Sequence, residues 1–135
     1  MCGAGDCFLI ETNYKSDGTI QSHLHIILLE PQEHTRSTIV VPVESLTSKK
    51  QDHTTILSLG EHEFIKHRSY VNYRRAKISS VIDIEKRVEE NTAKKKAPID
   101  TELLSRIVIG LKKSNHTPRE VLAMYGYYLM DQLGK

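Results

Sequence analysis

The sequence lacks several features that would indicate particular classes of protein. Its 135 residues include no tryptophan, two phenylalanines and two cysteines. Cys2 and Cys7 are too few for a disulfide framework, and no second cysteine pair is present to complete a zinc ribbon. We therefore expect a reduced protein in the cytoplasm and predict neither a metal ion nor another cofactor.

Long apolar runs are also missing. No stretch reaches the roughly 18 apolar residues that a membrane-spanning helix needs, and the first residues show no basic region followed by an apolar one. We expect neither a membrane segment nor a secretory signal. The apolar content of 39% and the charged content of 27% are ordinary for a globular protein. This length predicts one domain over residues 1–135.

Charge is distributed unevenly along the chain, although the net charge is only +2. Residues 1–48 contain two Lys or Arg and six Asp or Glu, whereas residues 49–97 contain twelve and seven. A basic middle third, which includes Lys94, Lys95 and Lys96, can attract the phosphate backbone of RNA. A solvated surface explains the same excess equally well.

Period-two patterns and turn residues predict five or six short strands in the first part of the chain. A turn at residues 16–19 joins the first two strands into a hairpin. Pro42 has no N–H to donate, so we expect an edge or a bulge there. The alternation in the last strand slips near Arg74 and Arg75, which suggests a bulge or an exposed end. The predicted strands cover residues 7–14, 20–30, 37–43, 54–59 and 69–78.

Helical spacing dominates the later part of the chain. Residues 81–88 fit either a short helix or an extended segment, and polar residues 89–97 predict a loop. Asp100 is a good N-cap for a helix that ends near residues 114–115. Residues 117–120 predict a capping box that begins a final helix, which Gly134 closes. The expected fold is therefore α+β, with strands in residues 1–80 and two C-terminal helices in residues 98–135 whose apolar faces pack on the sheet or across a dimer.

Two histidines could carry chemistry in the second strand. His23 and His25 lie on the same strand face. Two imidazoles at this spacing can bind one metal ion with Asp52, His53 or His62, or one can transfer protons while the other orients it. The structural alternative, which the pattern favours over either function, is two half-exposed histidines beside a sheet edge.

The stretch from residue 52 to residue 78 is rich in hydrogen-bonding side chains. His62 follows the flexible Gly60 and precedes the apolar Phe64, so a rigid turn could hold its imidazole for acid–base catalysis. Ser69 and Tyr73 point to the same side of their strand and could bind a phosphate. Arginine beside histidine suits phosphodiester cleavage. Alternatively, His62 and Tyr73 hydrogen-bond to each other and hold a loop.

Residues 5–10, 23–29 and 39–48 resemble the PemK/MazF-like toxin family. These segments read Gly-Asp-Cys-Phe-Leu-Ile near the start, an apolar strand in the middle, and Val-Pro-Val-Glu-Ser-Leu-Thr-Ser at the end. The resemblance implies a small SH3-like β-barrel, metal-independent cleavage of RNA, an antitoxin partner and a homodimer. Ser45 or Thr47 would take the position of the family's catalytic threonine, and His23 and His25 occupy the area of its catalytic arginine.

Together these observations predict a cytoplasmic RNA-cleaving ribonuclease of a toxin–antitoxin type. The alternative is a non-enzymatic small-barrel module that binds a protein or a nucleic acid through the same polar face. The candidate catalytic residues are His25, His62, Ser69 and Tyr73. The candidate substrate-binding residues are His23, Ser45, Thr47, Arg68 and Arg75.

Overall fold

The fold combines a seven-stranded antiparallel sheet with three α-helices, which confirms the α+β class. The structure is a computed structural model that describes residues 2–12, 18 and 20–134. The strands are β1 (Cys7–Thr12), β2 (Gln21–Ile27), β3 (Ser37–Ser45), β4 (Ile56–Leu57), β5 (Ser69–Val71), β6 (Lys77–Ser80) and β7 (Ala93–Lys96). The helices are α1 (Val81–Glu89), α2 (Thr101–Lys113) and α3 (Arg119–Leu133).

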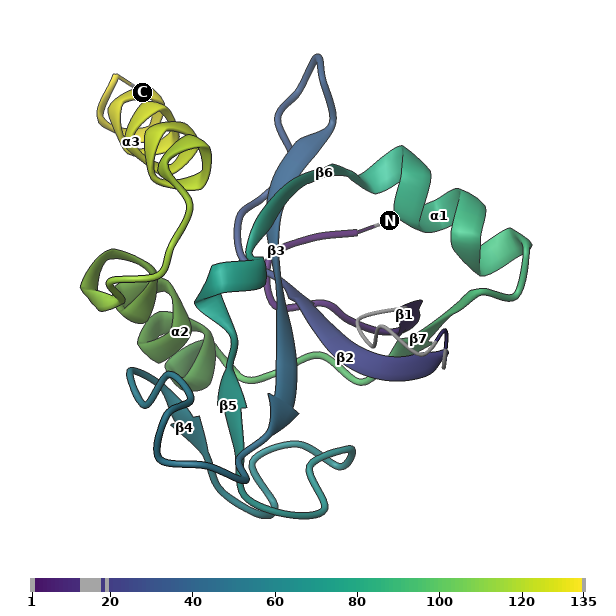
Figure 1. The fold of residues 1–135 in the computed structure, drawn as a ribbon. Coiled ribbons are helices and arrows are strands. Elements are labelled where there is room, and N and C mark those ends of the chain that lie inside the picture. Colours follow the sequence, from purple (N-terminus) through teal and green to yellow (C-terminus); the bar gives the residue numbers. More distant parts are fainter. Residues whose placement is uncertain (1, 13–17, 19, 135) are drawn as a thin grey trace.

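The strands follow the order β4-β5-β3-β2-β1-β7, and β6 also pairs with β3 (Figure 1). In the described part of the chain the sheet is open, with β4 and β7 at its two ends. β1 and β2 form the predicted hairpin, with Cys7 opposite Ile26. Apart from Gly18, its predicted turn at residues 16–19 lies outside the described residues.

The prediction of one strand over residues 69–78 is wrong. β5 and β6 both pair with β3, but a 3₁₀ turn at Tyr73–Arg75 separates them. Val43 lies opposite Val71, whereas Val40 lies opposite Lys77. The turn inserts extra residues between the two pairings. This insertion accounts for the slip in the apolar alternation that the sequence shows.

Pro42 lies inside the sheet rather than at an edge, because β3 is flanked by β2 on one side and by β5 and β6 on the other. Its carbonyl accepts the Asn72 N–H at 3.0 Å. The N–H and C=O positions of one strand residue face the same neighbour. The missing N–H of Pro42 therefore faces the interruption between β5 and β6, where no ladder bond is lost.

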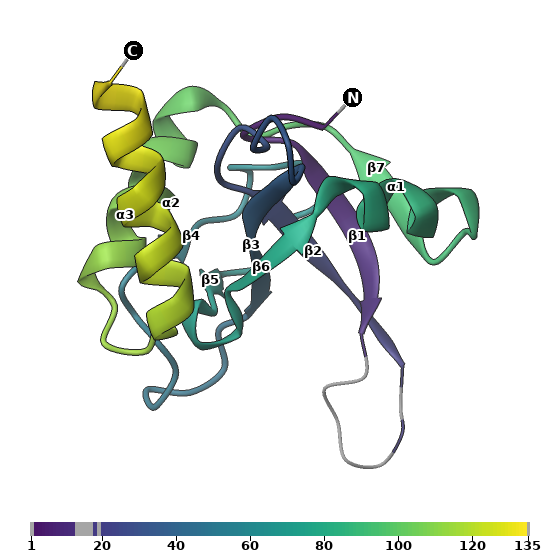
Figure 2. The same cartoon turned by 90° about the horizontal axis from the view of Figure 1, so that it is seen from above.

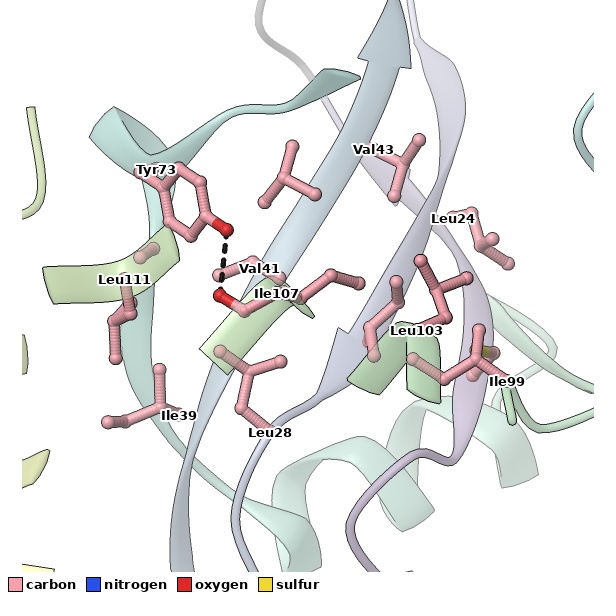
Figure 3. Packing of buried hydrophobic residues seen from close by; sticks show 14 of the residues in the cluster. Leu24, Leu28, Ile39, Val41, Val43, Tyr73, Ile99, Leu103, Ile107 and Leu111 are labelled. Atoms are coloured by element: carbon pink, nitrogen blue, oxygen red, sulfur yellow. Dashed lines mark hydrogen bonds between the residues drawn. The ribbon is translucent and has the colours of Figure 1, made fainter. Parts of the chain in front are cut away.

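Helices cover both faces of the sheet, with α2 and α3 on one side and α1 on the other (Figures 1 and 2). On the α2 side, residues of the central strands pack against Leu103, Ile107 and Leu111 in the main hydrophobic cluster (Figure 3). On the α1 side, residues of β1, β2 and β3 form a smaller cluster with Val81 and Ile84. Neighbouring residues of β2 thus face the two clusters, with Leu24 and Ile26 in the main one and Ile27 in the smaller one.

The helix ends follow the sequence signals in part. Asp100 accepts the Leu103 N–H at 2.8 Å and begins α2, which ends at Lys113 before Ser114, as predicted. Residues 81–89 form a helix, with Ser80 as the N-cap. The predicted capping box is wrong, because the Thr117 hydroxyl donates to the Leu111 carbonyl oxygen at 2.7 Å and α3 has no side-chain cap.

The final helix packs on the core through fewer residues than the sequence suggests. Val121 is fully buried, and Tyr125 and Tyr128 are partly buried against the main cluster. Leu122 and Leu129, which helical spacing places on the same face as Val121, are 37% and 38% exposed. None of the described helices combines the length and the apolar character that crossing a membrane would require.

The polar segment at residues 89–97 contains a strand, so the prediction of a loop is wrong. β7 pairs with β1, and Cys7 lies opposite Lys96. Ala93 is buried in the α1-side cluster, while Lys94 and Lys95 are exposed. Backbone hydrogen bonds rather than side-chain burial hold β7 at the end of the sheet, and they place its lysines beside β1.

Candidate active site

One cavity gathers several of the predicted site residues. It has a volume of about 420 Å³ and lies between β2, the end of β3 and the segment 64–69. Three of its lining residues are predicted site residues: His23, Ser45 and Ser69. Glu44, Lys66 and His67 are further ionisable or imidazole side chains on its wall. The cavity thus brings together three of the nine predicted site residues.

His67 lies on this wall beside the Ser45 hydroxyl. Its Nε2 lies 2.5 Å from the Ser45 hydroxyl oxygen, and both side chains are exposed. The Ser69 hydroxyl donates to the His67 carbonyl oxygen at 2.9 Å, and the Leu46 N–H donates to the Arg68 carbonyl oxygen at 3.0 Å. These bonds fix the backbone around His67 against the end of β3, while its imidazole remains open to solvent.

His23 supplies a second imidazole to the cavity. Its Nδ1 lies 2.7 Å from the Thr12 hydroxyl oxygen. Partial burial lowers the pKa of His23, and the charge of Arg75 lowers it further, while Glu44 opposes the change. A lowered pKa keeps this imidazole neutral at neutral pH, which is the form that accepts a proton.

Glu44 is the centre of a polar cluster beside His23. Its carboxylate accepts hydrogen bonds from the Tyr70 hydroxyl at 3.3 Å and from the Asn72 amide at 2.9 Å. Arg75 completes the cluster, with Nε 3.8 Å from a Glu44 oxygen. Burial and then the Glu44 charge raise the pKa of Tyr70 to about 12. Glu44 therefore balances Arg75 locally and holds it near His23.

His62 lies outside this cavity and connects two backbone segments. The Phe64 N–H donates to His62 Nδ1 at 3.0 Å, so Nε2 carries the proton and donates to the Ala97 carbonyl oxygen at 2.6 Å. The Ile65 N–H also donates to the His62 carbonyl oxygen at 2.9 Å. His62 is 6% exposed, so its ring joins the turn 62–65 to the chain just after β7.

Tyr73 is part of the core rather than of the cavity. It is fully buried, and its hydroxyl donates to the Ile107 carbonyl oxygen of α2 at 2.7 Å (Figure 3). The same oxygen lies 2.8 Å from the Thr55 hydroxyl oxygen. The Tyr73 oxygen also lies 2.1 Å from the place that a Cβ at Gly110 would take. Tyr73 and His62 thus hold different parts of the chain and do not clasp each other.

The remaining predicted residues lie apart from the cavity. His25 is 2% exposed, and its Nδ1 lies 2.8 Å from the His23 carbonyl oxygen. Burial lowers the pKa of His25 to about 4. Thr47 and Arg68 are exposed, and neither lines the cavity. The structure therefore does not bring His25, His62 and Tyr73 together.

Sequence reasoning missed His67, Glu44 and Lys66 as cavity residues. The sequence did contain a signal for His67, which lies two residues after the buried Ile65 and two residues before Ser69. Residues at this spacing share one side of an extended chain. For Glu44, the signal was a carboxylate at the end of a strand that is otherwise apolar.

No group of three His, Cys, Asp or Glu side chains able to hold a metal ion occurs within the described ranges. Cys2 and Cys7 are both buried and unpaired by a disulfide. The polar side chains that line the cavity include two imidazoles, serine hydroxyls, a lysine and the Glu44 carboxylate. No protein-family model matches this sequence, and the comparison with curated proteins finds no match.

Proposed function

We propose that this protein cleaves RNA in the cavity between β2, β3 and the segment 64–69, without a metal ion. The observation that carries the proposal is the meeting of two imidazoles, His23 and His67, with Ser45 and Lys66 on the wall of one open cavity. RNA contains its own nucleophile, the 2′-hydroxyl. Its cleavage therefore needs only a base, an acid and a cation that stabilises the charged phosphorane.

The two histidines divide the proton transfers. Neutral His23 accepts the proton of the 2′-hydroxyl, whose oxygen attacks the phosphorus. The bond from phosphorus to the 5′ oxygen breaks as protonated His67 donates a proton to that oxygen. The products are a 2′,3′-cyclic phosphate and a 5′-hydroxyl. Lys66 stabilises the negative charge of the transition state, and Ser45 orients the His67 ring through their 2.5 Å contact.

We further propose that the curved sheet corresponds to an SH3-like barrel of the PemK/MazF-like type. The segments that resemble this family fall mainly in β1, β2 and β3, and residues of β2 and β3 line the cavity. On this proposal the chain is a toxin-type ribonuclease, with an antitoxin and a second copy of itself as partners. Ser45 would then stand where the family has its catalytic threonine.

The test is cleavage of a defined RNA with and without EDTA. We expect cleavage to persist in EDTA, to stop at a position where one sugar is replaced by 2′-deoxyribose, and to yield a cyclic phosphate detected by mass spectrometry. A His67→Ala preparation purified in parallel controls for contaminating ribonucleases. Absence of cleavage, or its loss in EDTA, contradicts the proposal. Binding of RNA without cleavage would instead favour the non-enzymatic small-barrel module.

A further inference from the structure

We infer that the ring of Phe64 is a stacking platform for one unpaired base of a single-stranded RNA, beside the cavity in which the backbone is cleaved. This inference rests on the proposed function, since it assigns a base-binding position to the same cavity. Phe64 lines the cavity and is 38% exposed, whereas the other phenylalanine, Phe8, is 3% exposed in the core.

The backbone under this ring is held from two sides. The Phe64 N–H donates to His62 Nδ1 at 3.0 Å, and His62 Nε2 donates to the Ala97 carbonyl oxygen at 2.6 Å. The adjacent Ile65 is 4% exposed and anchors the turn in the core. An aromatic ring on a fixed turn loses little conformational freedom when a base stacks on it. The two hydrogen bonds of the His62 ring, called the His62 clasp below, therefore hold the Phe64 backbone in place before a base binds.

The charges around the ring suit a nucleotide rather than an apolar ligand. Lys96 Nζ lies 5.8 Å from the centre of the ring, at a distance that permits a cation–π contact. Lys66 lines the same cavity. A base on the ring would therefore place its phosphates within reach of two ammonium groups. Glu44, the carboxylate on this wall, has its charge balanced by Arg75 at 3.8 Å.

Phe64 is also close along the chain to the proposed acid. The segment from Phe64 to His67 forms one side of the cavity. A base stacked on Phe64 would thus belong to a nucleotide at or next to the cleaved phosphate. Bases in a duplex are already stacked and cannot use such a platform. The arrangement selects a single strand and favours no particular base, because every base has a π-face.

The experiment measures binding of an uncleavable strand by fluorescence anisotropy. The probe is an oligoribonucleotide of about 12 nucleotides, within the range of known single-strand sites, with 2′-O-methyl sugars. The proteins are the full chain and its variants Phe64→Ala, Phe64→Leu and Phe64→Tyr. Leu59→Ala is the matched control, since Leu59 is 69% exposed, lies in the same loop region and does not line the cavity.

We expect Phe64→Ala to weaken binding by about 5- to 150-fold, the loss that corresponds to one stacked base. Phe64→Leu, which keeps an apolar side chain without a π-face, should lose most of the same affinity. Phe64→Tyr and Leu59→Ala should bind like the unchanged protein. Binding of the annealed duplex should not change in any variant. Equal affinities of Phe64→Ala and the unchanged protein for the single strand would overturn the inference.

A series of strands with a single abasic position provides a second readout. The unchanged protein should lose affinity at one position of the series, and Phe64→Ala should show no such position. Persistence of that loss in Phe64→Ala also overturns the platform. If the strand binds through Phe64 but natural RNA is never cleaved, the catalytic proposal fails and the platform stands. If RNA is cleaved with an unchanged KM in Phe64→Ala, the platform fails and the catalytic proposal stands.

Discussion

Two regions of the molecule each contain a hydrogen-bonded hydroxyl side chain, but the hydroxyl is buried in one and exposed in the other. Around Tyr73, hydroxyl groups are buried, and they bond to each other and to the Ile107 carbonyl. Around His67, a hydroxyl and an imidazole bond to each other at the wall of an open cavity. The difference shows that burial, rather than residue type, separates polar side chains that hold the fold from those that can meet a substrate.

The same contrast recurs within a single loop. His62 has both ring nitrogens bonded to backbone groups, while the ring of His67 contacts one side-chain hydroxyl and remains exposed. A histidine whose two nitrogens are occupied cannot exchange a proton without breaking a structural bond. Each of the following predictions changes one side of this comparison.

The largest expected effect is on stability and concerns Tyr73. Tyr73→Ala should lower the free energy of unfolding by about 3–5 kcal/mol, since it leaves a cavity in the core. Tyr73→Phe should cost about 1–3 kcal/mol, because the buried Ile107 carbonyl and the Thr55 hydroxyl lose a partner. Urea denaturation measures both. A Tyr73→Phe protein that keeps its stability but loses activity would reverse the assignment of this region.

The next effect is on rate and concerns His67. His67→Ala should reduce RNA cleavage by about 10²- to 10⁴-fold, as expected for loss of a general acid or base, with an unchanged melting temperature. His53→Ala is a matched control, because His53 is also exposed, lies outside the cavity and bonds only weakly to the Ser48 carbonyl, at 3.3 Å. Equal rates for the two variants would remove His67 from the mechanism.

A third effect concerns pH and the buried His25. Its pKa is about 4 in the folded protein, against about 6.5 in an unfolded chain. Above pH 6.5 neither state binds the proton. Below it the unfolded state binds more protons, so stability should fall towards pH 4 by up to roughly 1.4 kcal/mol per pH unit, or about 3 kcal/mol in total.

Denaturation at several pH values measures this effect. His25→Leu should remove most of the pH dependence and leave the smaller share that His23, whose pKa is also lowered, contributes with the same sign. The carboxylates are the same in both proteins and form a common background. If the unfolding free energy of His25→Leu falls with pH as steeply as that of the unchanged protein, then His25 binds its proton as readily in the folded state as in the unfolded state.

The smallest expected effect on stability concerns the His62 clasp, the two hydrogen bonds between the His62 ring and the backbone at Phe64 and Ala97. His62→Ala should lower the free energy of unfolding by about 1–2 kcal/mol, the usual value for loss of one or two partly buried hydrogen bonds. Cleavage by the folded protein should change only as far as the position of Phe64 changes, so KM should rise while kcat stays similar. Loss of kcat at full stability would instead place His62 in the chemistry.

The elements that could be predicted are those whose own residues carry the signal. Periodic apolar residues and the Asp100 cap define α2, and alternation defines the β1–β2 hairpin. β7 could not be found in this way, because its pairing with β1 uses backbone groups and only Ala93 is buried against the core. The break between β5 and β6 left a signal in the slipped alternation, but that signal does not distinguish a bulge from a 3₁₀ turn.

The composition of the sequence indicated part of the candidate site, but it did not show which role each side chain has. The stretch of residues 52–78 contains one side of the cavity, at residues 64–69, and the predicted His23, Ser45 and Ser69 all line it. Tyr73 appeared equally suited to chemistry, since its partner is a helix carbonyl at Ile107 that no local pattern reveals. His62 stands between Glu61 and Glu63, and His67 stands between Lys66 and Arg68. Neither pair of neighbours shows which ring is buried, so only the tertiary contacts of the two rings separate their roles.

The close approach at Gly110 restricts the order in which substitutions can accumulate. A Cβ there would lie 2.1 Å from the Tyr73 hydroxyl oxygen and 2.3 Å from the Thr55 hydroxyl oxygen, and 2.8 Å from the ring carbon that bears the Tyr73 hydroxyl. Removing the hydroxyl alone therefore does not make room for alanine. The residues at positions 55, 73 and 110 therefore depend on one another. Gly110 cannot be replaced by a larger residue until the side chains at positions 55 and 73 have become smaller.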